Sequence, residues 1–208
     1  MNSNSAITLP TKITIVRLVM IPMLIVSYCL QPLYEYLFII TALLFIIASM
    51  TDFVDGHIAR KYNMVSDLGK LLDPIADKVL VATGLFILID GNYVPELPYI
   101  EMICSVIIIA REFMIGVIRQ VAALKNVVLA ADKLGKIKTA STMFALTFLL
   151  CSAHKGIVFE VFKYIGTALL IVATIVTVIS GVNYIVKNKT LLFAKTKDDE
   201  SENNEDKE

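Results

Sequence analysis

Six long apolar segments constrain this chain more than any other feature of its sequence. They lie at about 13–30, 33–60, 71–89, 98–123, 134–152 and 158–186. A helix that crosses the hydrocarbon core of a bilayer needs ~20 apolar residues, and every segment reaches or approaches that length. Hydrophobic residues make up 57% of the chain and charged residues only 18%, a balance that a soluble domain of this size does not carry. The sequence therefore predicts an all-α integral membrane protein with six transmembrane helices.

The positions of Lys and Arg predict how these helices are oriented. Basic residues gather in the second connection, in the fourth connection and after the sixth segment, whereas the third connection has none. Cytoplasmic loops carry an excess of Lys and Arg, so both termini are expected on the cytoplasmic side of the cell membrane. The formal net charge is +0, and we expect no nucleic-acid partner because no overall field would attract one.

Both ends of the chain differ from the apolar segments. Residues 9–14 mix polar and apolar positions and predict an amphipathic turn at the membrane interface, with Lys12 and Arg17 near the lipid headgroups. The acidic residues 191–208 predict a disordered cytoplasmic tail. The membrane domain is accordingly expected at 1–190.

Four aspartates surround the second connection. Asp52 and Asp55 are three residues apart and Asp73 and Asp77 are four apart, so each pair shares one face of a helix. The connection is short, so the two helices run antiparallel and their acidic faces can meet. Converging carboxylates near a bilayer repel each other and resist the loss of water, which a hard cation such as Mg²⁺ or Mn²⁺ relieves. Four Asp side chains could hold the two divalent ions used in phosphoryl-transfer chemistry.

Small and basic residues complete this acidic pattern. Gly56 and Gly69 leave space on the acidic faces, and the planar guanidinium of Arg60 suits phosphate oxygens. The whole pattern, D-x2-D-G-x2-A-R-x8-G-x3-D-x3-D, resembles the signature of the CDP-alcohol phosphatidyltransferase family at every fixed position. With the six-segment layout, the resemblance covers about 9–186.

The resemblance implies a reaction of phospholipid biosynthesis. An acceptor hydroxyl attacks the lipid-side phosphorus of CDP-diacylglycerol, and CMP leaves. The family resemblance makes Asp52, Asp55 and Asp73 metal ligands, and it makes Asp77 both a ligand and the general base. It further implies that Gly56, Arg60 and Gly69 line the CDP pocket and that the protein is a homodimer in the lipid bilayer.

A second group of basic residues bears on the acceptor. Arg111 and Arg119 are two helical turns apart on nearly the same face, and the stretch 132–139 adds Lys133, Lys136 and Lys138. We expect these side chains to form a pocket for a phosphate that the acceptor already carries, although Lys133, Lys136 and Lys138 could instead be ordinary positive-inside charges. A buried Arg is costly and usually has a partner, so Arg111 could instead pair with Glu112 or another buried acid.

The sequence around these basic residues narrows the resemblance. Arg-Glu-Phe-x5-Arg and Gly-Lys-x-Lys-Thr resemble the branch of the family that uses sn-glycerol 3-phosphate, the phosphatidylglycerophosphate synthases. Gly116 stands where that branch often has Ser. A family member with another acceptor is the main alternative, such as phosphatidylglycerol in cardiolipin synthesis, serine or inositol phosphate.

Two other classes of protein fit the sequence less well. A cation-coupled transporter also keeps carboxylates in the membrane, but transport sites lie near the midplane between broken helices. The four aspartates here lie at predicted cytoplasmic helix ends. A non-catalytic scaffold gives no reason to keep four acids near hydrocarbon.

Overall fold

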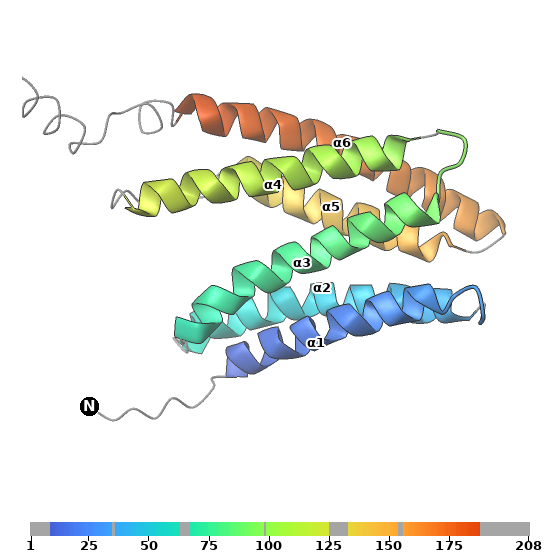
Figure 1. Ribbon diagram of the computed structural model, residues 1–208, viewed down its shortest axis with the longest axis horizontal. Coiled ribbons are helices and arrows are strands. Elements are labelled where there is room, and N and C mark those ends of the chain that lie inside the picture. The colour runs from blue at the N-terminus through green and yellow to red at the C-terminus, as the bar shows by residue number, and fades with distance from the viewer. Residues whose placement is uncertain are drawn as a thin grey trace, which may run out of the picture.

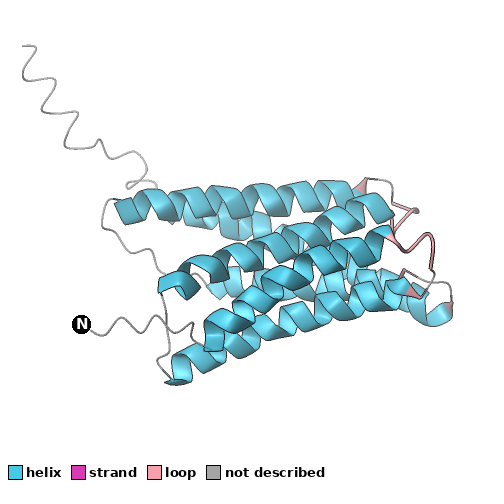
Figure 2. Cartoon of the chain, turned by 60° about the horizontal axis from the view of Figure 1, so that its bottom comes forward, coloured by secondary structure: helices cyan, strands magenta, loops and turns pink. Residues whose placement is uncertain are grey.

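The part of the chain that the structure describes forms a bundle of six helices. The computed structural model describes residues 9–34, 36–62, 67–97, 99–124, 133–153 and 156–187 (Figure 1). The helices are α1 (Leu9–Cys29), α2 (Leu37–Tyr62), α3 (Asp67–Gly91), α4 (Ile100–Leu124), α5 (Lys133–Cys151) and α6 (Ile157–Lys187). This described part of the chain contains no strand (Figure 2), which confirms the all-α prediction. Each helix overlaps one of the six apolar segments.

Successive helices run in opposite directions, so their ends gather at the two ends of the bundle (Figure 1). One end holds the first turns of α1, α3 and α5 and the last turns of α2, α4 and α6, and we call it the near end. The far end holds the opposite termini. α1 packs against α2 and α3, while α6 packs against α5 and α4. α3 also contacts α4 and α5 and so joins the two groups.

Small residues allow close packing in the interior of the bundle. A Cβ atom on Gly84 of α3 would lie 3.0 Å from Cε2 of Phe45 and 3.1 Å from Cδ1 of Leu146. Both neighbours are fully buried. Glycine is common where membrane helices approach closely, because there packing supplies much of the attraction between helices.

The outward faces of the helices are apolar. Val19, Phe113 and Val182, on α1, α4 and α6, are each more than half exposed, and large apolar side chains are exposed on all six helices. Buried hydroxyl groups bond their own helices instead of water, as Thr41 does to the Leu37 carbonyl and Thr174 to the Leu170 carbonyl. Extensive exposed apolar surface marks a membrane or partner contact. The fold is therefore that expected of a membrane protein.

Length and composition single out two described helices as able to cross a bilayer. They are Thr11–Cys29 and Ile157–Lys187, and shorter apolar helices lie at Leu37–Thr51 and Ile137–Cys151. α3 and α4 are long enough, but charged residues interrupt their apolar runs. Six membrane crossings therefore remain a prediction.

The beginning of α1 differs from the expectation for 9–14. This stretch is not a separate interfacial turn but the continuous start of α1, in which Thr11 and Thr14 are buried and Lys12 is exposed. Arg17 is fully buried within the protein, and its Nη1 atom pairs with Asp73 of α3. The predicted acidic tail at 191–208 lies outside the described residues.

Candidate active site

Asp73 is held at the start of α3 by a buried cation of α1. Nη1 of Arg17 lies 3.4 Å from Oδ1 of Asp73, and the side chain of Arg17 is 0% exposed while that of Asp73 is 49% exposed. The pair orients one carboxylate oxygen toward α1 and leaves the remainder of Asp73 accessible. The sequence contained a signal for such a pair, because α1 has no acidic residue and a buried Arg needs a partner from another helix.

Asp77 lies one helical turn after Asp73 and lines a pocket between α3, α4 and α5. The pocket has a volume of about 360 Å³. Its charged lining residues are Asp77, Lys78, Glu112 and Lys138, and the apolar ones include Val81, Leu85, Phe86, Ile108 and Phe113. A cavity with charges at one side and hydrocarbon along the rest suits an amphipathic ligand such as a lipid.

Glu112 joins two cations beside this pocket. Its Oε1 atom accepts hydrogen bonds from Nη1 of Arg111, at 3.0 Å, and from Nζ of Lys138. Arg111 also donates from Nη2 to Oγ of Ser180 at 2.7 Å. The sequence left open whether Arg111 binds the acceptor phosphate or pairs with Glu112, and in this structure it pairs with Glu112. The cluster ties α4 to α5 and α6. Lys138, expected among the basic residues, is buried in the same cluster.

Two glycines provide room for long basic side chains. A Cβ atom on Gly181 of α6 would lie 3.2 Å from Cγ of Arg111. A Cβ atom on Gly116 of α4 would lie 3.1 Å from Nζ of Lys78. Lys78 directly follows Asp77 and was not among the predicted site residues, but it lines the same pocket. Gly116 has no side chain, and this leaves space for the ammonium group of Lys78.

Arg119 also faces α6. Its guanidinium carbon lies 5.8 Å from the ring centroid of Tyr184, which is within the range of a cation–π contact. The prediction that Arg111 and Arg119 share a side of α4 agrees with their contacts, because both touch α6. The side chains of Lys133 and Lys136 lie outside the described residues, although α5 begins at Lys133.

The other half of the acidic pattern lies on the last turns of α2. The α2 backbone is helical from Asp52 to Arg60 and through Gly56, but these side chains lie outside the described residues. Gly69 is part of α3, one turn before Asp73. The end of α2 and the start of α3 meet at the near end of the bundle (Figure 1).

The donor atoms in this region fit a hard divalent cation. Among the side chains that the structure describes, no group of three or more His, Cys, Asp and Glu residues stands together. Asp73 and Asp77 are the two described members of the expected four, and both offer oxygen atoms alone. Carboxylate oxygen is the ligand that Mg²⁺ and Mn²⁺ favour.

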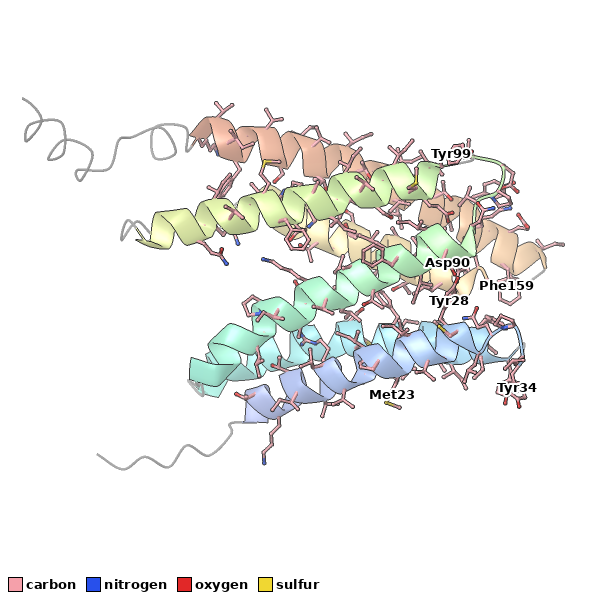
Figure 3. All side chains as sticks on the ribbon, in the orientation of Figure 1. Met23, Tyr28, Tyr34, Asp90, Tyr99 and Phe159 are labelled. Atoms are coloured by element: carbon pink, nitrogen blue, oxygen red, sulfur yellow. The ribbon has the colours of Figure 1, made fainter. Side chains whose placement is uncertain are left out.

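The far end carries a different set of polar contacts. Tyr28 of α1 donates a hydrogen bond to Asp90 of α3 at 2.9 Å. Both side chains are labelled in Figure 3. Lys163 of α6 lies 2.7 Å from Glu96, and this hydrogen bond holds the pKa of Glu96 below its ordinary value. These residues lie at the opposite end from Asp73 and supply control positions for experiments.

Comparison with known proteins identifies relatives over most of the chain. The family model described as CDP-alcohol phosphatidyltransferase matches residues 7–183. A Rickettsia bellii protein named CDP-diacylglycerol–glycerol-3-phosphate 3-phosphatidyltransferase is 40% identical over 177 residues, 85% of this chain and 92% of its own. The Bacillus subtilis protein of that name is 38% identical over 86% of this chain and 94% of its own. An Arabidopsis thaliana protein of that name, numbered 2, is 36% identical over 93% of this chain and 84% of its own.

Proposed function

This chain belongs to the CDP-alcohol phosphatidyltransferase family, and we propose that it transfers the phosphatidyl group of CDP-diacylglycerol to sn-glycerol 3-phosphate. The products are phosphatidylglycerol phosphate and CMP. The observation that carries this proposal is the position of the Arg111 and Lys138 cluster beside the pocket that Asp77 lines. A phosphate on the acceptor would thus bind close to the carboxylate that activates its hydroxyl.

The aspartates of α2 and α3 would hold two divalent ions, Mg²⁺ or Mn²⁺. The ligands are Asp52, Asp55, Asp73 and Asp77, and the bound ions would supply positive charge to the diphosphate of the donor. Asp77 would accept the proton of the acceptor hydroxyl while the hydroxyl oxygen forms a bond to the lipid-side phosphorus. The bond from that phosphorus to the bridging oxygen breaks, and CMP leaves with the electron pair.

The donor and the acceptor would occupy different sides of the site. Gly56, Arg60 and Gly69 would contact CDP at the junction of α2 and α3. The apolar part of the pocket would take lipid chain, since Leu85 and Phe113 offer no polar group. Arg111, Arg119, Lys133, Lys136 and Lys138 would contact the phosphate of the acceptor.

The setting of this site in the membrane follows the sequence prediction. Six helices would cross the bilayer, with the near end and both termini on the cytoplasmic side, where soluble glycerol 3-phosphate is available. The domain at 1–190 would form a homodimer, and the acidic tail at 191–208 would be disordered in the cytoplasm. Exposed apolar residues on all six helices support the bilayer placement.

An acceptor panel tests the proposed function. Purified protein is supplied with CDP-diacylglycerol, Mg²⁺ and one acceptor at a time, and CMP release is measured. We expect release with glycerol 3-phosphate and none above background with phosphatidylglycerol, serine or inositol phosphate. Addition of EDTA should stop the reaction. Release that does not depend on glycerol 3-phosphate would contradict the assignment, and ion flux in liposomes without CMP release would favour a transporter.

Gly181→Val tests the role of Arg111 without changing any charge. Added methyl groups at this position would meet the side-chain stem of Arg111 and displace its guanidinium. We expect the KM for glycerol 3-phosphate to rise about tenfold, the effect of losing roughly one charged hydrogen bond. Val182→Ala is the matched control, because Val182 is 57% exposed on the same helix. This substitution should leave the KM values for glycerol 3-phosphate and for CDP-diacylglycerol unchanged. An unchanged KM in Gly181→Val would remove Arg111 from the acceptor site.

A further inference from the structure

We infer that Glu112 is a positioning residue for the acceptor, because its carboxylate holds Arg111 and Lys138 together so that both can face one phosphate group. This inference rests on the proposed function and deepens it. In the sequence alone, Glu112 is a candidate partner that neutralises Arg111. The structure gives it a second cation from a different helix, which changes what the carboxylate can do.

The first support is the shape of the contact. One oxygen atom, Oε1 of Glu112, accepts from both Arg111 and Lys138. The two cations come from α4 and α5, and their charges repel each other at short range in a site with little water. A carboxylate between them offsets that repulsion. Removing it would drive the two side chains apart or turn Lys138 away from the pocket.

The second support is the balance of charge around the pocket. Arg111, Glu112 and Lys138 together keep one net positive charge, so the cluster can still attract an anion. Glu112 and Lys138 line the same pocket as Asp77, and their charges lie on the side where the acceptor hydroxyl must approach. An acceptor with a phosphate close to its hydroxyl can meet both groups at once.

The third support is the anchoring of Arg111 from its other side. Nη2 donates to Ser180 of α6, while Nη1 donates to Glu112. The guanidinium is therefore held at two points, with its stem against Gly181. A buried ion pair contributes little stability over well-packed apolar residues, so stability alone explains this arrangement poorly.

The test is Glu112→Gln compared with Glu112→Asp. Gln has almost the same shape as Glu but no charge, so it would no longer hold the two cations together. We expect the KM for glycerol 3-phosphate to rise tenfold or more, roughly the loss of one charge-assisted hydrogen bond. The KM for CDP-diacylglycerol and kcat should stay within about twofold, because the Asp residues remain in place. Glu112→Asp keeps the charge on a shorter side chain and should restore most of the affinity.

The matched control is Glu160→Gln, which removes an exposed carboxylate that pairs with Lys163 at the far end. It should change neither KM. An unchanged KM for glycerol 3-phosphate in Glu112→Gln would overturn the inference, as would an equal rise in both KM values. A lower KM would also overturn it, because Glu112 would then compete with the phosphate.

The same experiment separates this inference from the proposed function. Wild-type protein that releases no CMP on addition of glycerol 3-phosphate contradicts the proposed function, and this inference falls with it. Wild-type protein that depends on glycerol 3-phosphate, with Glu112→Gln indistinguishable from it, contradicts the inference alone. Thermal unfolding of each variant is measured alongside, and a Glu112→Gln variant that loses its fold overturns the inference, because Glu112 would then act through stability.

Discussion

Asp73→Asn should reduce CMP release on the order of a thousandfold while the protein remains folded. A neutral amide binds a divalent ion far less well than a carboxylate does, and charge stabilisation by metals is worth several kcal/mol of barrier. The fold should survive because the Asn side chain keeps an oxygen in the position of Oδ1. That oxygen can still accept the hydrogen bond from the buried Arg17. The measurements are CMP release and thermal unfolding in detergent.

Asp90→Asn is the control for this substitution. Asp90 lies on the same helix at the far end, exposed and hydrogen-bonded to Tyr28. It should keep wild-type turnover and wild-type stability. Normal activity in Asp73→Asn would remove Asp73 from the metal site. Loss of the folded state in Asp73→Asn would instead show that the main role of Asp73 is to pair with Arg17.

Gly166→Val should destabilise the bundle more than a substitution at any exposed glycine. α6 packs closely on α5 at this point, and a Cβ atom on Gly166 would lie 2.7 Å from Cγ of Leu149 and 3.0 Å from its backbone nitrogen. Leu149 is fully buried, and a backbone atom cannot turn away as a flexible side chain can. The two helices must therefore separate, at a cost of about 3 kcal/mol.

Thermal unfolding measures this effect. A loss of that size should lower the Tm by roughly 5 °C or more. The control is Gly135→Val in α5, where no atom outside the immediate chain lies within 4 Å of the new Cβ. That variant should show only the small helix-propensity difference between Gly and Val. Equal Tm values for the two variants would mean that α5 and α6 are not tightly packed at Gly166.

The starts of two helices illustrate how far apolar runs in the sequence determine helix boundaries. The third apolar run begins only at about residue 71, but Ser66 or Asp67 is a plausible N-cap for its helix, and α3 does begin at Asp67. The polar first turn carries no hydropathy signal, although its backbone is helical. The second apolar run was expected from residue 33, but α2 begins at Leu37, because Leu33 and Tyr34 belong to turns despite their apolar side chains. The extent of an apolar run indicates which residues are buried in lipid or protein. It does not by itself determine where the helical backbone begins or ends.

Some features of the candidate site followed from the sequence, and others depended on helix packing. Spacings of three and four residues placed the members of each Asp pair on one helix face, and this follows from helix geometry alone. The requirement that Arg111 has a partner also followed from the sequence, because a buried charge is costly in any fold. The choice between Glu112 and other acids could not be made, since it depends on how α4, α5 and α6 pack.

The sequence by itself determined that the chain is helical, apolar on the outside and a member of this transferase family. It did so because periodicity, length and a long fixed motif are local properties of a chain. Only the tertiary structure decided that Arg17 holds Asp73, that Glu112 joins Arg111 to Lys138, and that Gly116 lies against Lys78. The Arg17–Asp73, Glu112–Lys138 and Gly116–Lys78 contacts each join two helices, so they depend on packing that no local pattern specifies, whereas Arg111 and Glu112 are neighbours in the sequence.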